Sequence, residues 1–184
     1  MHLKAEDVAV IVSPMLRAIQ TAGIALKWLG VPFETDASWQ EESDEPCNTG
    51  RPISSLCAGY RSLLDTTKLD PFWPDKQTLL NTDDYYLGSK TDDRGQRCVF
   101  ELSQRPEKVV FVVSHGRFLS QSVTFCKFAR ADYRIFDFDV VWWREKSRKL
   151  TQDEFSKPYG GRGRSSPKES GRIMVIRYVE PAEW

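Results

Sequence analysis

Two stretches of the chain share one arrangement of apolar and polar positions. In each, a continuous apolar run rich in β-branched residues, at 8–12 and at 109–113, is followed by a short turn with a serine and then by a helical pattern. An unbroken apolar run, unlike an alternating one, is typical of a strand buried on both faces, as in parallel sheets. The order of strand, turn and helix, found twice, therefore predicts an α/β fold.

The helical segments carry signals for their ends. Ser13 suits the N-cap of the first helix and Pro14 its first turn, and Gly30 closes it. Apolar residues at helical spacing predict a second helix over about 53–65. A third helix is expected over about 91–104, with an apolar face that leads into the second buried strand.

The chain after residue 129 has a weaker pattern. Aromatic residues alternate with aspartates within 133–143, which predicts a half-exposed strand, and the apolar run at 173–176 predicts another. Between them, 156–171 is rich in glycine, arginine and serine, and we expect a disordered insertion there. The length predicts a single domain over 1–184.

Composition and charge exclude several classes of protein. Lysine plus arginine and aspartate plus glutamate both number 26, so the formal net charge is +0 and no overall field draws the chain to nucleic acid or to an acidic membrane. No apolar run approaches the roughly 18 residues of a membrane span. The four cysteines form no CxxC pair, which favours reduced thiols and a cytoplasmic protein.

One stretch allows a contrary interpretation. The Arg-Gly-Arg sequence at 162–164 could bind RNA, as some arginine–glycine segments do. The stretch is short, its one aromatic neighbour is Tyr159, and the chain is neutral overall. We therefore expect an inert surface loop and no nucleic-acid partner.

His115 is placed where α/β proteins bind ligands. It follows the second buried run directly, and the carboxyl ends of parallel strands border the ligand crevice of such sheets. Gly116 lets the backbone approach a ligand closely, and the helix that begins near Arg117 offers unpaired N–H donors to an anion. The alternative is a structural histidine packed against a loop.

Arg17 and Glu41 are the other candidates. A cation in the first turn of a helix, as at Arg17, is unfavourable beside the positive end of the helix dipole. A phosphate bound by Arg17 and the helix N-terminus would compensate for it. The alternative interpretation is that Arg17 is a solvated surface arginine beside a carboxylate. Glu41 opens the acidic loop 41–45 and could protonate a leaving oxygen, although such loops are usually only solvated.

Three segments together resemble one known family. The sequence at 13–22, S-P-M-L-R-A-I-Q-T-A, and that at 112–119, V-V-S-H-G-R-F-L, are similar to motifs of the histidine phosphatase superfamily, the phosphoglycerate mutase-like proteins. The segments W-Q-E and P-C-N-T-G within 39–50 resemble a stretch of its fungal members. The resemblance implies three layers: a mostly parallel central sheet with helices on both faces.

The resemblance also implies a chemistry. Small phosphorylated substrates would react through a phosphohistidine, with no metal or other cofactor. His115 would bind the phosphoryl group and stabilise its developing charge, Glu41 would be the general acid, and Arg17 would clamp the phosphoryl group. The implied site therefore has two catalytic residues and four substrate-binding ones: Glu41 and His115, and Ser13, Arg17, Gly116 and Arg117.

One family motif finds no match. An R-H-G at the end of a central strand, which supplies the nucleophilic histidine, is expected some tens of residues before the run at 8–12, and His2 is followed by Leu3 instead. We therefore expect the chain to lack the nucleophile and one central strand, as an N-terminally truncated domain would, unless another segment fills the place of that strand.

Two functional hypotheses follow from this departure. The first is a phosphomonoesterase represented without its first strand and helix, and the alternative is an inactive pseudophosphatase that binds phosphorylated ligands or partners. Arg51 and Arg117 could hold a second anionic group of a substrate. The sequence leaves open the identity of the substrate, the choice between phosphatase and mutase, and the oligomeric state.

Overall fold

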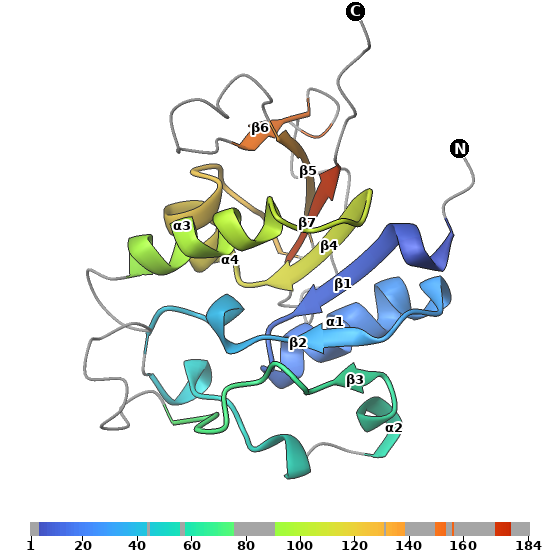
Figure 1. The fold of residues 1–184 in the computed structure, drawn as a ribbon. Helices are drawn as coiled ribbons and strands as arrows, with labels where there is room; N and C mark the ends of the chain where they lie inside the picture. Colours follow the sequence, from blue (N-terminus) through green and yellow to red (C-terminus); the bar gives the residue numbers. More distant parts are fainter. Residues whose placement is uncertain are drawn as a thin grey trace, which may run out of the picture.

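A seven-stranded sheet runs through the part of the chain that the computed structural model describes, which is residues 4–43, 45–55, 58–75, 91–130, 132–138, 150–153, 156 and 172–177. Its strands are β1 (Val8–Val12), β2 (Phe33–Thr35), β3 (Leu64–Asp65), β4 (Val109–Ser114), β5 (Tyr133–Phe138), β6 (Leu150–Gln152) and β7 (Arg172–Arg177). The order across the sheet is β3-β2-β1-β4-β7-β5-β6 (Figure 1).

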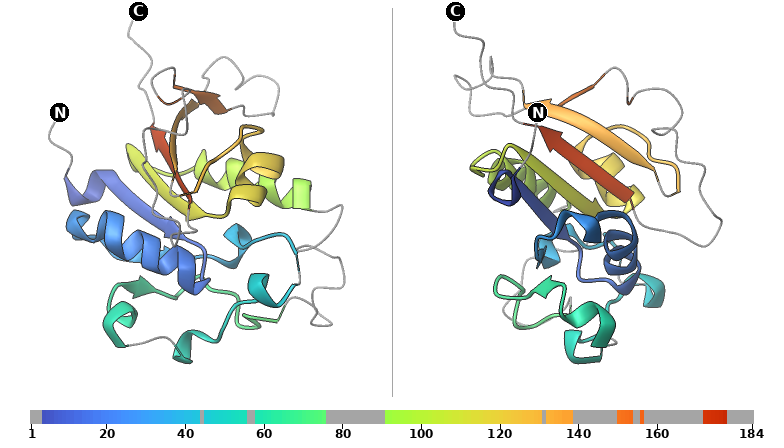
Figure 2. Two further views of the ribbon diagram at one scale, coloured as in Figure 1. Left: turned by 180° about the vertical axis from the view of Figure 1, so that it is seen from behind. Right: turned by 90° about the vertical axis from the view of Figure 1, so that its right-hand side faces the viewer.

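Helices cover both faces of this sheet. The α-helices are α1 (Leu16–Leu26), α2 (Ala58–Arg61), α3 (Thr91–Leu102) and α4 (Gly116–Phe118), and α4 continues into a π-helical turn, η7 (Leu119–Val123). The 3₁₀ turns are η1 (Ala5–Asp7), η2 (Lys27–Leu29), η3 (Ala37–Trp39), η4 (Pro46–Asn48) and η5 (Ile53–Ser55). Figures 1 and 2 show α1 on one face and α3 on the other, so the α/β fold and its three layers are confirmed.

The pleat of β1 divides its side chains between two cores. All five residues of the strand are buried, as its unbroken apolar run predicts. Ala9 and Ile11 pack in the core that α3 covers, whereas Val10 and Val12 pack with Ile19 of α1 on the opposite face. Successive side chains of a strand point to opposite faces, so a strand between two helical layers must be apolar throughout.

The sheet is mixed, so the expectation of a mostly parallel sheet holds only in part. Four of the six strand pairings are parallel, and those of β4 with β7 and of β5 with β6 are antiparallel. The loss of a central strand predicts unpaired backbone groups inside the sheet, but β4 pairs with β1 on one side and with β7 on the other. A segment from the C-terminal part of the chain thus satisfies the backbone groups of β4.

The first helix begins later than its sequence signals predict. Met15, not Ser13, holds the N-cap position of α1, and Ser13 Oγ lies 3.5 Å from the Met15 amide nitrogen, which is at the limit of a hydrogen bond. The N-cap prediction for Ser13 is therefore wrong, because its hydroxyl is engaged elsewhere. Gly30 ends the helical segment in a left-handed conformation, with φ of 69°, as predicted.

The other helix predictions have different outcomes. The third helix is confirmed as α3, with Cys98 and Leu102 each 1% exposed. The single helix predicted over 53–65 is wrong in extent, because η5 and α2 are followed by the short strand β3, which pairs with β2 through Leu64 and Phe33. Backbone pairing with an existing sheet edge takes precedence there over local helical spacing.

The C-terminal predictions are tested only in part. β5 forms the first part of the strand predicted over 133–143, with Arg134 and Phe136 buried, and β7 contains the run at 173–176. Of the insertion predicted at 156–171, only Ser156 belongs to the described residues, and it is buried with its carbonyl accepting from Arg134. No helix in the described part of the chain has both the length and the apolar character for a membrane span.

An ion-pair cluster fastens β2 to the loop between α3 and β4. Glu34 accepts hydrogen bonds from Arg105 (2.6 and 3.0 Å) and from Lys68 (2.9 Å). Burial opposes the ionisation of Glu34, but the hydrogen bonds from Arg105 and Lys68 outweigh it, so the pKa of Glu34 lies below its usual value. The cluster therefore stabilises the fold only while Glu34 is ionised.

Glu34→Gln is expected to lower the free energy of unfolding at neutral pH by about 1–2 kcal/mol, a modest value because solvent reaches the cluster. The folded pKa is the lower one, so the stabilisation is complete above about pH 4.5 and is lost as the pH falls through the folded pKa. Urea unfolding at neutral and acidic pH should show a smaller acid loss in the variant than in the wild type.

Glu101→Gln is the matched control for this substitution. Glu101 pairs with Arg97 on the exposed surface of α3, at 3.1 Å, so its loss is expected to cost less than about 0.5 kcal/mol. Equal effects of the two substitutions, or an unchanged acid loss in Glu34→Gln, would contradict the role given to Glu34.

Candidate functional site

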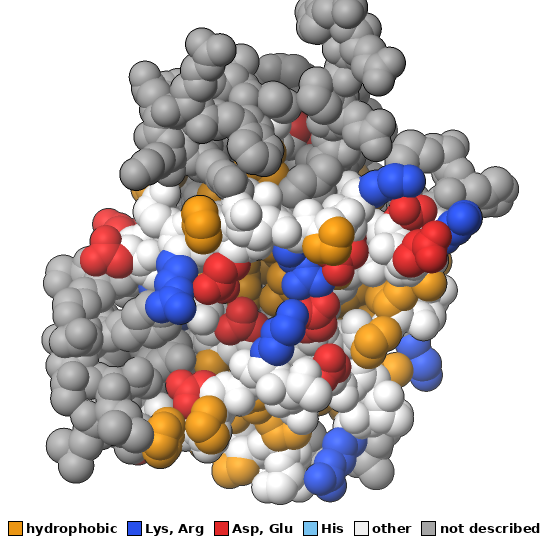
Figure 3. Space-filling model, in the orientation of Figure 1, with side chains coloured by type: hydrophobic (Ala, Val, Ile, Leu, Met, Phe, Trp, Pro, Cys, Tyr) orange, Lys and Arg blue, Asp and Glu red, His pale blue; other side chains and the backbone are white. Residues whose placement is uncertain are grey.

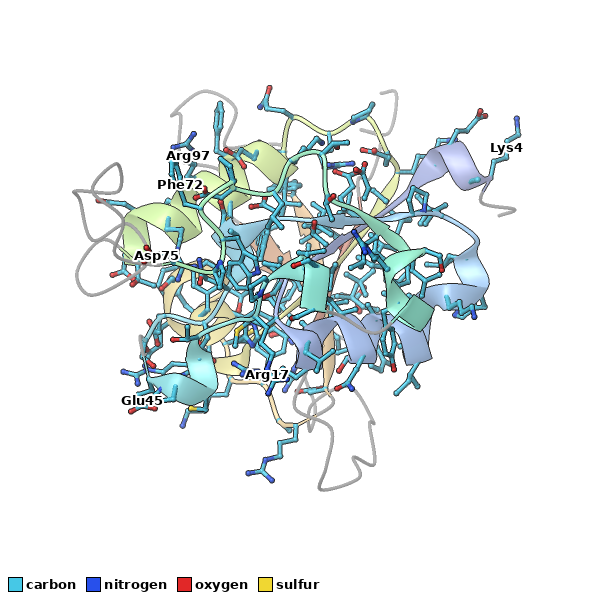
Figure 4. The ribbon with its side chains drawn as sticks, turned by 90° about the horizontal axis from the view of Figure 1, so that it is seen from below. Lys4, Arg17, Glu45, Phe72, Asp75 and Arg97 are labelled. Carbon is cyan, nitrogen blue, oxygen red and sulfur yellow. The ribbon has the colours of Figure 1, made fainter. Side chains whose placement is uncertain are left out.

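The parallel strands β1 and β4 end at the same edge of the sheet. Val12 lies opposite Val113, and the Ser13 N–H donates to the Val113 carbonyl (2.9 Å). The residues that follow the two strands are therefore neighbours in space, although about 100 positions separate them in the sequence. Figure 4 shows Arg17 at this edge, well away from Lys4, which precedes β1 at the other end of the strand. Open α/β sheets bind ligands at this edge.

The guanidinium of Arg17, in the first turn of α1, holds together three segments. Its Nε donates to His115 Nδ1 (3.1 Å), and its two terminal nitrogens donate to the Cys47 carbonyl (2.6 Å) and to Asn48 Oδ1 (3.0 Å). Burial lowers the pKa of Arg17, and the nearby Glu41 opposes that shift. A guanidinium remains charged at any physiological pH, so the site contains a partly desolvated cation.

His115 is buried, with 1% of its surface exposed, and both of its ring nitrogens have partners. Nδ1 accepts the hydrogen bond from Arg17, and Nε2 lies 2.8 Å from Ser13 Oγ. Because Arg17 can only donate, Nδ1 carries no proton in this arrangement, and the Nε2–H of a neutral ring donates to Ser13. Ser13 and Arg17 together thus fix the orientation of the imidazole.

Glu41 reaches the same place from the loop after η3. Its Oε1 accepts from the backbone N–H groups of Phe118 (3.1 Å) and of Glu42 (3.2 Å). Glu42 forms an ion pair with Arg117, with 2.5 Å between Oε1 and Nε. Burial raises the pKa of Glu42, and the charge of Arg117 opposes that shift. The two adjacent glutamates therefore have different partners, one on the backbone of α4 and one on its arginine.

A cavity of about 460 Å³ opens among these groups. It is lined by Arg17, Glu41, His115, Gly116, Arg117, Ser120, Lys127 and Phe128. The structure thus brings together five of the six predicted site residues around one space. Ser13 contacts the ring of His115 but is not part of this lining, and Arg51 is exposed, with its carbonyl accepting from Trp73 (3.0 Å).

Sequence reasoning missed several residues of this region. Asn48 accepts a hydrogen bond from Arg17. It belongs to the segment 46–50, which resembles a family motif, but that resemblance assigned no role to Asn48. Lys127 and Phe128 lie beyond the second histidine motif and belong to no motif of their own. Lys127 adds a third cation to the lining beside Arg17 and Arg117, so the cavity has three basic side chains and one carboxylate, Glu41.

A second and larger cavity, of about 530 Å³, lies over β1 and β2 and shares none of these residues. Its wall includes Glu34, Lys68 and Arg105, whose charges pair with one another. Figure 3 shows a hollow at the centre of this face, with acidic and basic side chains around apolar ones. Within the described ranges, no group of three or more His, Cys, Asp and Glu side chains is arranged to hold a metal ion.

Comparison with protein families gives one match. The family model of the histidine phosphatase superfamily (branch 1) matches residues 2–139, which is most of the chain and includes β1, β4 and every residue that lines the smaller cavity. No curated protein and no solved structure matches the chain. Since the matched region spans well over half of the sequence, the chain belongs to the histidine phosphatase superfamily.

Proposed function

We propose that the smaller cavity binds the phosphoryl group of a small phosphorylated substrate, and that the chain is a phosphomonoesterase-type histidine phosphatase. One observation carries the proposal. Arg17 and His115, from the ends of two parallel strands, are in direct contact at 3.1 Å, and Glu41 lines the same cavity. The fungal-type segment at 39–50 favours a phosphatase over a mutase.

The cation of Arg17 is the principal phosphate ligand in this proposal. Its guanidinium is partly desolvated, which lowers its pKa, and a phosphate dianion would offset that desolvation. The N–H groups of Gly116 and Arg117 offer further donors, since that of Phe118 is held by Glu41, and the side chains of Arg117 and Lys127 contribute positive charge at the lining. His115 stabilises the charge that builds on the phosphoryl oxygens during transfer.

Glu41 acts as the proton donor to the leaving oxygen. Two backbone N–H groups hold its Oε1, so the carboxyl group is fixed in direction while it lines the cavity. A positioned acid contributes most when the leaving group is a poor one, because it must then be protonated as the bond to phosphorus breaks. Substrates with alkyl leaving groups should therefore depend on Glu41 more than aryl phosphates do.

The nucleophile of such a reaction is a second histidine. In His115, Nδ1 accepts from Arg17 and Nε2 carries the ring proton that faces Ser13, so the ring offers an N–H donor to a phosphoryl oxygen but no free lone pair for attack, and we assign His115 to binding. The only other histidine of the sequence is His2, which lies outside the described residues. The same engagement of His115 favours a second candidate function, an inactive relative that binds phosphorylated ligands or partners without turnover.

An assay of aryl phosphate hydrolysis in the presence of a chelator, with inorganic phosphate binding measured in parallel, tests both functions. The phosphatase proposal predicts metal-independent hydrolysis that falls at least about 100-fold in His115→Ala, since charge stabilisation in the transition state is worth that much. Phosphate binding without hydrolysis would support the binding-only alternative. If the protein neither binds phosphate nor hydrolyses the ester, both are wrong.

A further inference from the structure

Arg94, a buried cation on α3, lies between the segment that precedes Glu41 and the short helix that follows His115. Arg94 is 0% exposed. Its Nη1 donates to the backbone carbonyls of Ser38 (3.0 Å) and Gln40 (2.9 Å), which precede Glu41, and its Cζ lies 4.0 Å from the centre of the Phe118 ring in α4. One side chain therefore contacts both the backbone that leads into Glu41 and the short helix that follows His115.

The backbone before Glu41 is fixed at three successive carbonyls. Arg94 holds the carbonyls on either side of Trp39, and Ser114 Oγ, at the end of β4, donates to the carbonyl of Trp39 itself (2.7 Å). The Trp39 side chain is buried and meets the Phe118 ring edge-on, with centroids 6.1 Å apart and an angle of 82°. This segment therefore has little freedom to rotate, and the position of Glu41 follows from it.

The carboxylate of Glu41 is held from the other side by the same unit. The Phe118 N–H donates to Glu41 Oε1 (3.1 Å), and the ring of Phe118 lies against the guanidinium of Arg94. A cation over an aromatic face is attracted by the ring quadrupole, more so where water is excluded. The charge that fixes the backbone of Glu41 thus also fixes the residue whose amide holds its side chain.

The neighbour of Arg94 brings α3 close enough for these contacts. A Cβ on Gly95 would lie 2.0 Å from the carbonyl oxygen of Ser122 in η7, so only glycine allows this approach between α3 and the π-helical turn. π-helical turns are frequent at functional sites, where they displace one stretch of helix relative to the next. Gly95 sets the distance of α3 from η7, and Arg94 then reaches across to the Glu41 segment.

We propose that Arg94 is a positioning residue whose guanidinium sets the place of the Glu41 carboxylate relative to His115 and the cavity. The inference rests on the proposed function, which makes Glu41 the proton donor. Burial of a guanidinium costs desolvation free energy, and apolar packing between α3 and α4 does not require one. The planar group suits this place because its Nη1 donates to two carbonyls while its face stacks on the Phe118 ring.

The amide of Phe118 reports this geometry without any need for turnover. Because its N–H donates to the Glu41 carboxylate, its NMR chemical shift at fixed pH is expected to move when Glu41→Gln replaces that carboxylate by a neutral amide. In the Arg94→Met background, which keeps a long unbranched side chain without the charge, this movement is expected to fall by at least about half. The equivalent substitution on the exposed side of α3, Arg97→Met, should leave it unchanged.

Two further observations keep the test decisive. If Arg94→Met gives no dispersed spectrum, Arg94→Lys keeps a buried cation but not the planar fork, and its Phe118 movement should lie below that of the wild type. A movement of wild-type size in either folded variant would overturn the positioning role. Failure of the wild-type protein to bind phosphate would instead count against the proposed function, because the Phe118 measurement does not depend on it.

Discussion

Arg17→Met is expected to weaken the binding of inorganic phosphate by about 100-fold. Hydrogen bonds to charged groups are worth about 1.5–3 kcal/mol, and a guanidinium that binds two phosphate oxygens lies at the upper end of that range, where 1.4 kcal/mol is a tenfold change. The variant also leaves His115 Nδ1 and the Cys47 carbonyl without the donor that they share in the wild type. Calorimetry, or the phosphorus resonance of phosphate on titration, measures the change.

Arg51→Met is the matched control for this prediction. It removes the same charge from an exposed residue that does not line the cavity, so the net charge changes equally in both variants. Its phosphate affinity is expected to remain within about twofold of that of the wild type, since screening weakens distant charges. Comparable losses of phosphate affinity in the two variants would mean that phosphate binding depends only on the overall charge, and the proposal that the cavity binds phosphate would be wrong.

Gly95→Ala is expected to lower the free energy of unfolding by at least about 2 kcal/mol. The added Cβ would lie 2.0 Å from the Ser122 carbonyl oxygen and 2.5 Å from its carbon, and backbone atoms cannot move aside as a flexible side chain can. Overpacking typically costs about 1–3 kcal/mol, and a 2.0 Å contact with backbone lies at or beyond the upper end of that range, whereas alanine gains about 1 kcal/mol over glycine inside a helix. The clash therefore outweighs the helix propensity, and urea or thermal unfolding should show the loss.

Gly23→Ala makes the same substitution within α1. There the new Cβ would meet the side chain of Tyr60 at 3.2 Å, a contact that a few tenths of an ångström of movement relieves. The gain in helix propensity is the same in both variants, so their difference isolates the clash. We expect Gly23→Ala to be neutral or stabilising by up to about 1 kcal/mol. Destabilisation as large as that of Gly95→Ala would show that the close approach of α3 to η7 is not the cause.

The sequence predicted correctly that Arg17 and His115 lie together, while the roles it gave them stay predictions. Arg17 and His115 each follow a buried strand, and two parallel strands of one sheet end at one edge, so their proximity could be inferred without coordinates. Ser13 lies at the predicted edge, but it is not the N-cap of α1. Its position before Pro14 is typical of a helix cap. Its hydroxyl instead lies 2.8 Å from His115 Nε2, a contact that arises because β1 and β4 are neighbours in the sheet.

The residues that sequence reasoning missed have long-range partners. Asn48 contacts Arg17 and Arg94 contacts the backbone before Glu41, across 31 and more than 50 positions of sequence, and no periodicity encodes such contacts. The pairing of β7 beside β4 is of the same kind. Nothing in the apolar run at 173–176 specifies which strand edge it completes or in which direction.

The sequence by itself determined that 8–12 and 109–113 are buried strands, where α1 and α3 lie to within a few residues, and which two strand ends bring an arginine to a histidine. Those features depend on local propensity and on apolar patterns that adjacent residues carry. Only the tertiary structure decided the order of the sheet, the second partner of His115, and the buried Arg94 between Trp39 and Phe118. These depend on which surfaces meet when the chain packs, and packing selects partners by shape and by unsatisfied polar groups from anywhere in the chain.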